Sequence, residues 1–140
     1  HDGAIAAFLA DHDPKRACRR AVAMVDELGA EFSRASEKLQ EHWPLQLQIA
    51  LAGHIGLALL DSAPVAGADT RQLVIVGPGI DELDRLRQML AERGAGVVLS
   101  RALLAEIGEL PEFMAITAES AAGDLILGDL KNGTATHNMR

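Results

Sequence analysis

Apolar residues recur every three or four positions over a long stretch near the start of the chain. The members of this series are Cys18, Ala21, Val22, Val25, Leu28 and Phe32. This spacing predicts an amphipathic helix from Pro14 to about Leu39, loosened at Gly29. Asp13 is placed to cap its N-terminus, and proline suits the first helical position. The buried face also includes Cys18, where a thiol is inert.

Shorter apolar runs bounded by turn-forming residues predict the strands. Leucines and an isoleucine alternate with glutamines from Leu45, so we expect a strand with one wet face within 45–60. Gly53 and Gly56 in that run indicate a bulge or a close backbone approach. Residues 61–70 are rich in turn formers and predict a loop. Other strands are predicted at 73–76 (buried), 96–100, 113–117 and 124–130, the last two as a hairpin. Residues 2–10 are predicted to form a strand, although their apolar pattern also fits a helix segment.

Two further helices follow strand-like runs. One is predicted from Ile80 or Asp81 to Arg93, with Gly94 at its C-terminal end, and the other at 101–107 with Ser100 as its N-cap. Strands and helices therefore alternate before strands close the chain, which is typical of an α/β or α+β fold with a mixed sheet. We expect one domain over 1–131 and a flexible polar tail over 132–140.

The junction Gly77-Pro78-Gly79 joins a strand to a helix, as phosphate-binding loops do. Carboxylates at Asp81 and Glu82 follow it, however, and these repel a bound anion while they favour the helix dipole. No lysine follows the glycines, and the dinucleotide-binding spacing is missing. Direct phosphate binding by the turn is therefore disfavoured, and a surface ion pair between Asp81 and Arg85 is the simpler expectation.

Composition and charge narrow the possible partners. The 140 residues carry 13 basic and 20 acidic side chains, a net charge of −7, which argues against nucleic-acid binding. We see no Lys/Arg cluster that would reverse this interpretation. A single cysteine excludes an intrachain disulfide and fits a reducing compartment.

No apolar run approaches the ~18 residues that span a bilayer, and no signal peptide is visible. We therefore expect a cytoplasmic domain that makes no membrane contact itself. The chain does not start with Met, so it is also interpretable as a piece of a longer protein, including the cytosolic domain of a membrane-anchored one.

The histidines and the tryptophan offer little chemistry by their spacing. No histidine pair has a metal-ligand spacing, so a zinc site is not expected. His54 lies in an apolar run, and we expect it to be a hydrogen-bonded core residue. Trp43, beside Pro44, is expected to be a packing anchor.

Five segments, in order, resemble the catalytic domains of class III nucleotidyl cyclases, the adenylate and guanylate cyclases. They are HDGAIAAF (1–8), DPKRACRRAVAMVDEL (13–28), LQIALAGHIGLALL (47–60), RQLVIVGPGIDELDRLRQML (71–90) and GAGVVLSRALL (94–104). The third is similar to the family's RIGIHTGEVVVG strand and the fourth to its RLDYTVIGPAVNLASRLEGL segment. The resemblance covers roughly residues 1–105, and the order and spacing of the segments carry it more than any single motif.

The resemblance implies a ferredoxin-like sandwich of the nucleotidyl cyclase type, working as a homodimer or with a paired cyclase domain. ATP or GTP lies at the dimer interface in that family. Two aspartates there hold two Mg²⁺ or Mn²⁺ ions, and the products are a cyclic nucleotide and pyrophosphate. In the family the first metal aspartate lies on an upstream strand that has no counterpart in this chain, so we expect the domain to be N-terminally incomplete.

The resemblance also assigns expected roles to individual residues. Asp2 falls on the second metal aspartate, and Arg85 on the arginine that stabilises developing phosphate charge. Asp81 replaces an asparagine that orients the ribose, and an ionised Asp accepts but does not donate. Gln72 replaces an aspartate that reads the adenine amino group, so base choice stays open. Lys131 matches faintly a segment whose lysine reaches the phosphates, although an exposed turn lysine is the ordinary explanation.

Three hypotheses remain open from the sequence. The first is an enzyme, a cyclase-like domain with impaired activity. The second is a catalytically inactive cyclase-homology module that serves dimerisation or regulation of a larger signalling protein, which the changes at Gln72 and Asp81 favour. The third is an unrelated α/β binding domain.

Overall fold

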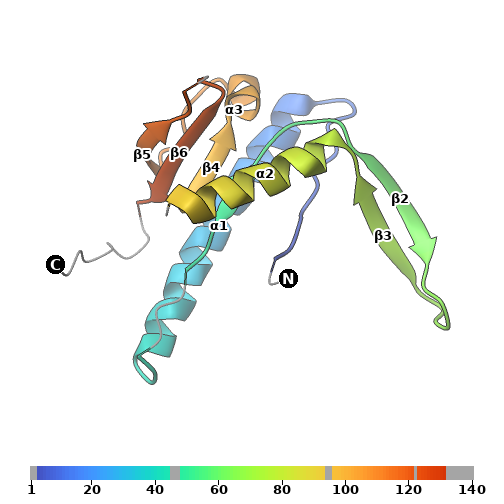
Figure 1. Ribbon diagram of the computed structural model, residues 1–140, viewed down its shortest axis with the longest axis horizontal. Helices are drawn as coiled ribbons and strands as arrows, with labels where there is room; N and C mark the ends of the chain where they lie inside the picture. Colours follow the sequence, from blue (N-terminus) through green and yellow to red (C-terminus); the bar gives the residue numbers. More distant parts are fainter. Residues whose placement is uncertain (1–2, 45–47, 94–95, 122, 132–140) are drawn as a thin grey trace.

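The computed structural model describes residues 3–44, 48–93, 96–121 and 123–131 (Figure 1). Their order and type establish a mixed α/β fold. The elements are α1 (Pro14–Gln40), β1 (Leu51–Gly53), β2 (Leu59–Pro64), β3 (Arg71–Val76), α2 (Pro78–Arg93), β4 (Val97–Ser100), α3 (Arg101–Ile107), β5 (Met114–Glu119) and β6 (Leu125–Leu130).

The strands form two separate sheets. The larger has the order β1-β4-β6-β5, in which β1 runs parallel to β4 and the other neighbours are antiparallel. The second is the β2–β3 hairpin, which projects away from the rest of the molecule (Figure 1). The expected mixed sheet is therefore confirmed, with an additional arm beside it.

Helices cover both faces of the larger sheet. Val97 and Leu99 of β4 pack in a core cluster with residues of α1 and α3, whereas Val98 between them packs with Leu86 and Leu90 of α2. Successive side chains of a strand point to opposite faces, so a strand covered on both sides must be apolar at every position. This explains why β4 is buried throughout.

Helix α1 agrees with its prediction. The Asp13 carboxylate accepts a hydrogen bond from the Arg16 N–H at 3.0 Å, and Cys18 is buried. Burial raises the pKa of the Cys18 thiol, which favours the unreactive form. The expected loosening at Gly29 is wrong. The helix is continuous there, and a Cβ at Gly29 would lie 2.5 Å from Leu130 Cδ1, so the glycine serves close packing.

The C-terminal half also agrees with its prediction. The Ser100 hydroxyl accepts from the Leu103 N–H at 3.3 Å and caps α3, which ends at Gly108 in a left-handed conformation. Strands β5 and β6 pair as the expected hairpin. The predicted C-terminal glycine of α2, Gly94, and the tail 132–140 lie outside the described residues.

Several predictions in the first half are wrong. Residues 3–10 form no strand, and the strand predicted within 45–60 is reduced to β1 and the start of β2, with residues 45–47 outside the described part. Strand β2 continues to Pro64, so only residues 65–70 of the predicted loop 61–70 connect β2 to β3. Strand β3 is not buried as expected: Leu73 and Val76 are exposed, because no other described element forms a layer over the hairpin.

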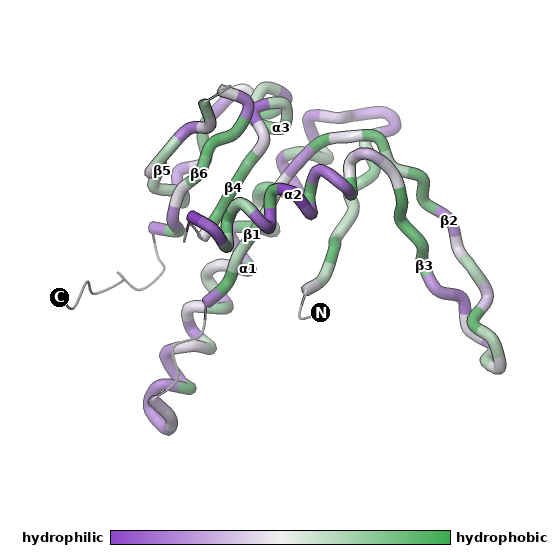
Figure 2. The backbone as a smooth tube through the Cα atoms, viewed as in Figure 1, coloured by the Kyte–Doolittle hydropathy of each residue, from purple (hydrophilic) through white to green (hydrophobic). Residues whose placement is uncertain are grey.

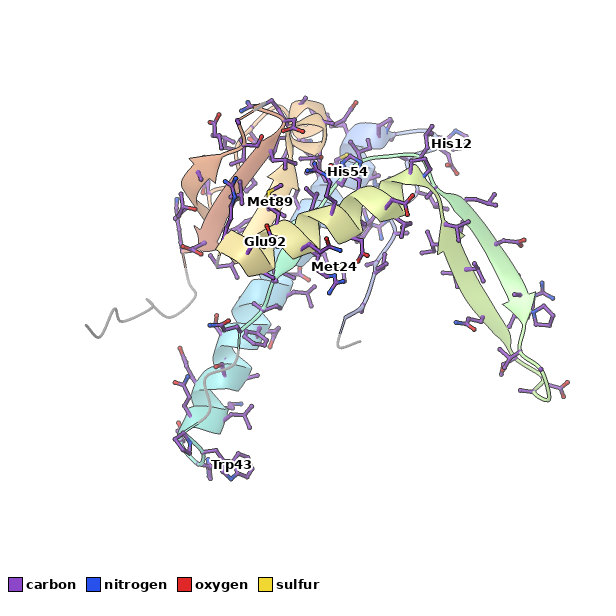
Figure 3. All side chains as sticks on the ribbon, viewed as in Figure 1. His12, Met24, Trp43, His54, Met89 and Glu92 are labelled. Atoms are coloured by element: carbon purple, nitrogen blue, oxygen red, sulfur yellow. The ribbon has the colours of Figure 1, made fainter. Side chains whose placement is uncertain are left out.

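Trp43 is not a packing anchor. It lies just beyond the C-terminal end of α1 and is 57% exposed (Figure 3).

None of the described helices is long and apolar enough to cross a membrane.

Candidate functional site

The glycines of the Gly77-Pro78-Gly79 turn let two backbone segments approach closely. Gly77 has φ +136°, a conformation that L side chains rarely adopt. The Gly79 N–H donates to the Leu57 carbonyl at 2.9 Å, and a Cβ on Gly79 would lie 3.0 Å from that oxygen. This amide is therefore already used to join the start of α2 to the base of the hairpin. The turn therefore serves as a close crossing between α2 and the segment that leads into β2.

Arg85 lies on the exposed side of α2 and pairs with Glu82. Its Nε and Nη2 donate to the two carboxylate oxygens of Glu82 at 2.9 and 2.6 Å, a two-point contact. The prediction that Arg85 pairs with Asp81 is therefore wrong. The hydrogen bond from Arg85 holds the pKa of Glu82 below its usual range, and Glu82 raises the pKa of Arg85. Glu82 therefore holds the Arg85 guanidinium in place and balances its positive charge.

The rest of this face of α2 is acidic. Asp81 is exposed in the first turn, where its charge favours the helix dipole. Asp84 forms a second i,i+3 ion pair with Arg87 at 3.0 Å. Three carboxylates therefore stand beside two guanidinium groups, so this stretch carries a net negative charge.

His54 lies beside this helix, just after β1 (Figure 3). Its Nδ1 is buried and, among the described residues, has no hydrogen-bond partner, so the expectation of a hydrogen-bonded core histidine is wrong. A Cβ on Gly56 would lie 2.8 Å from His54 Nε2, which shows how closely the chain turns around the ring. Burial lowers the pKa of His54, Glu82 opposes this shift and Arg85 adds to it.

Asp124, just before β6, completes the charged group. The Ser120 hydroxyl donates to its carboxylate at 2.6 Å, and this hydrogen bond is the main reason for its lowered pKa. The positive charge of Arg85 lowers it further. Sequence reasoning missed both Glu82 and Asp124. The i,i+3 spacing to Arg85 was the available signal for Glu82, whereas no local signal indicated Asp124.

The other predicted site residues lie elsewhere in the single chain. Gln72 stands opposite Ala63 on the hairpin, five residues and about 17 Å of extended strand before Gly77. Lys131 follows β6 at the end remote from Asp124, roughly 20 Å along that strand, and its N–H donates to a carbonyl. Asp2 lies outside the described residues. One copy therefore does not bring Gln72 or Lys131 to Arg85.

The hairpin exposes an unusual number of aliphatic side chains. Six of the large hydrophobic residues exposed in the described chain lie between positions 57 and 76: Leu57, Leu59, Leu60, Val65, Leu73 and Val76. Leu57 is 83% exposed, and Leu59 65%. Figure 2 shows apolar stretches along both strands of the arm. This apolar arm, residues 57–76, is the second candidate functional feature.

Comparisons of the chain with protein-family models, with curated proteins and with solved structures gave no match. In the described ranges, no group of three or more His, Cys, Asp or Glu side chains is arranged to hold a metal ion, so we assign none of these residues to one.

Proposed function

We propose that this chain is a nucleotidyl cyclase-like domain that pairs with a second copy of itself through the apolar arm. The observation that carries the proposal is the exposure of the arm's aliphatic side chains. Exposed apolar side chains gathered on one element in this way favour an interaction site.

The hairpin register shows why a partner is needed. Leu59 opposes Val76 on one face, while Leu60 opposes Ile75 and Ser62 opposes Leu73 on the other, so both faces carry aliphatic side chains. A lone two-stranded hairpin is marginally stable in water, and its outer edges present unpaired backbone groups. Packing against a second copy covers these side chains and stabilises the arm.

Pairing also supplies what a single copy lacks. Gln72 is carried on the arm, and Arg85 is on the body of the molecule. In a two-fold arrangement each arm reaches toward the other copy, so the two side chains are able to face one shared cleft. The resemblance implies that ATP or GTP binds in such a cleft. The order of elements supports the resemblance: a helix at 14–40 is followed by a strand–turn–helix at 71–93 and a strand–helix at 97–107.

We further propose that the chain as given is a dimerisation and regulatory module without turnover. The start of α2 repels a triphosphate electrostatically, because its three carboxylates (Asp81, Glu82 and Asp84) outnumber its two arginines. Arg85 is also occupied by Glu82 in the free chain. A phosphate must displace that carboxylate before it binds the guanidinium.

Catalytic turnover, with Mg²⁺ or Mn²⁺ and ATP or GTP, is the second candidate. It is favoured by the Arg85 side chain being 49% exposed. An exposed ion pair such as Arg85–Glu82 contributes only about 0.2–1 kcal/mol, so little free energy is lost when the pair breaks. A bound phosphate is therefore able to compete with Glu82 for the guanidinium.

Sedimentation analysis of the purified chain tests the pairing. We expect a reversible dimer that Leu73→Asp weakens at least tenfold. Leu110→Asp is the matched control, since Leu110 is similarly exposed outside the arm and the substitution adds the same charge. A monomer at all concentrations, or equal weakening by both variants, contradicts the proposal.

An assay with ATP or GTP and Mn²⁺, scored for cyclic nucleotide, separates the two candidates. We expect no product above background. Product formation that Arg85→Ala abolishes and Arg87→Ala preserves establishes the enzyme instead. Arg87 is the appropriate control because it lies on the same helix in an equivalent i,i+3 ion pair.

A further inference from the structure

Four of the 13 basic residues gather within six positions at the start of α1. They are Lys15, Arg16, Arg19 and Arg20, named here the α1 basic cluster. All four are exposed, and in the described part of the chain none of them forms an ion pair. The sequence-based statement that the chain has no Lys/Arg cluster is therefore wrong for this stretch.

The cluster is placed against local electrostatics. The N-terminal end of a helix carries partial positive charge and favours acidic side chains, yet the first turn of α1 has none. Like charges stand four apart twice, at Lys15 with Arg19 and at Arg16 with Arg20, and such pairs are destabilising. A bound anion relieves both effects at once.

The cluster surrounds a concave surface. An open hollow of about 540 Å³ is lined by Asp13, Ala23 and the four basic residues. The Asp13 carboxylate in it is occupied, since it accepts the Arg16 N–H. The Arg20 guanidinium lies over the Phe8 ring, 5.6 Å from its centre, in a cation–π contact. The hollow therefore brings four cationic side chains together with one carboxylate, so its charge is clearly positive.

We propose that this hollow binds clustered phosphate groups, carried either by a soluble polyphosphate or by a phospholipid headgroup. Three of the four cations are arginines, whose planar donors match phosphate oxygens in two-point contacts. The opposite half of α1 shows that this charge is local. Residues 26–40 carry four acidic and two basic side chains, so the excess of positive charge on α1 is confined to its N-terminal part. The inference is independent of the function proposed for α2 and the arm.

Binding of inorganic tripolyphosphate, measured by titration calorimetry, tests the soluble source. Co-sedimentation with phosphatidylcholine vesicles, with and without phosphatidylglycerol, tests the lipid source. We expect the double variant Arg16→Gln/Arg19→Gln to weaken binding at least tenfold in one of the two assays. It removes like-charge repulsion, so it is expected to fold, and its circular dichroism is the check.

Arg34→Gln/Lys38→Gln is the matched control, because it removes two charges from exposed positions of the same helix. Its binding should equal that of the parent chain, as should that of Arg85→Ala. The proposal is overturned if neither probe binds, if both double variants weaken binding equally, or if Arg85→Ala alone abolishes it.

Discussion

His54 combines burial with a ring nitrogen that has no hydrogen-bond partner among the described residues. Protonation would place a charge in this site, which burial disfavours, so the folded-state pKa of His54 is lowered. Glu82 and Arg85 of α2 are the charged groups that act on it, and their effects oppose each other. The unfolded chain restores an ordinary pKa of about 6.5. Between the two values, the unfolded state binds more protons than the folded state.

The free energy of unfolding should therefore decrease as the pH falls below about 6.5 toward the folded-state pKa of His54. His54→Gln should reduce this dependence, because glutamine does not titrate. Urea unfolding between pH 7 and pH 5 measures it. His12→Gln, at an exposed position, should keep the parental slope. Parallel curves for the parent chain and His54→Gln would contradict the role given to His54.

Glu82 reports directly on the position of Arg85. Arg85→Ala should raise the pKa of Glu82 toward its ordinary range, because the hydrogen bond from the guanidinium is its first cause of lowering. Carboxyl carbon resonances followed over pH measure this shift. Arg87→Ala, which breaks only the pair with Asp84, should leave the Glu82 titration unchanged. The stability change should stay below about 1 kcal/mol, since the pair is exposed.

At the scale of elements, the crossing of α2 over the base of the hairpin depends on Gly79. A methyl group there would lie 3.0 Å from the Leu57 oxygen and 3.3 Å from the Gly56 carbonyl carbon. Because both are backbone atoms, the strain cannot be relieved by a side-chain rotation, and Gly79→Ala should destabilise the fold by about 1–3 kcal/mol. Thermal unfolding measures this loss. Gly3→Ala is the control, because no atom lies within 4 Å of that position. Equal melting temperatures for both variants would show that the crossing is not tight.

Elements with local signals could be predicted from the sequence. Asp13 and Ser100 mark the starts of α1 and α3, because capping depends only on residues a few positions away. The hairpin could not be predicted in its exposed state, since the alternation that indicates a strand says nothing about what covers it. Gly29 was misjudged because its partner, Leu130, is distant in sequence. Asp124 could not be linked to Arg85 for the same reason, because the two residues are distant in sequence.

The candidate site was predicted only in part. Arg85 was correctly placed on a helix after the glycine turn, yet its partner depends on side-chain geometry that spacing leaves undecided between i+3 and i+4. Burial of His54 follows from its apolar neighbours, whereas no local signal in the sequence indicates that its Nδ1 lacks a hydrogen-bond partner among the described residues. The cyclase resemblance supplied the roles of Gln72 and Lys131, which the structure of one copy leaves untested.

At the scale of the whole molecule, a well-packed body is joined to an arm that lacks a core. Leu99 and Leu127 in the sheet are almost fully buried, whereas Leu59 and Leu73 on the arm are more than half exposed. Local stability follows the density of buried apolar contacts. The body should therefore be stable by itself, while the arm depends on whatever covers it.

Hydrogen exchange at two protein concentrations tests this dependence. In dilute solution the backbone amides of β2 and β3 should exchange much faster than those of β4 and β6, because the two-stranded arm opens easily by itself. At concentrations that favour the dimer, the protection of the arm's amides against exchange should increase at least tenfold. A bound second copy stabilises the hydrogen-bonded hairpin by mass action. In the Leu73→Asp variant, protection should stay low at both concentrations, while Leu110→Asp should behave like the parent chain. Strong protection of the arm in dilute solution would mean that the hairpin is stable without a second copy, and the pairing surface would then have to lie elsewhere.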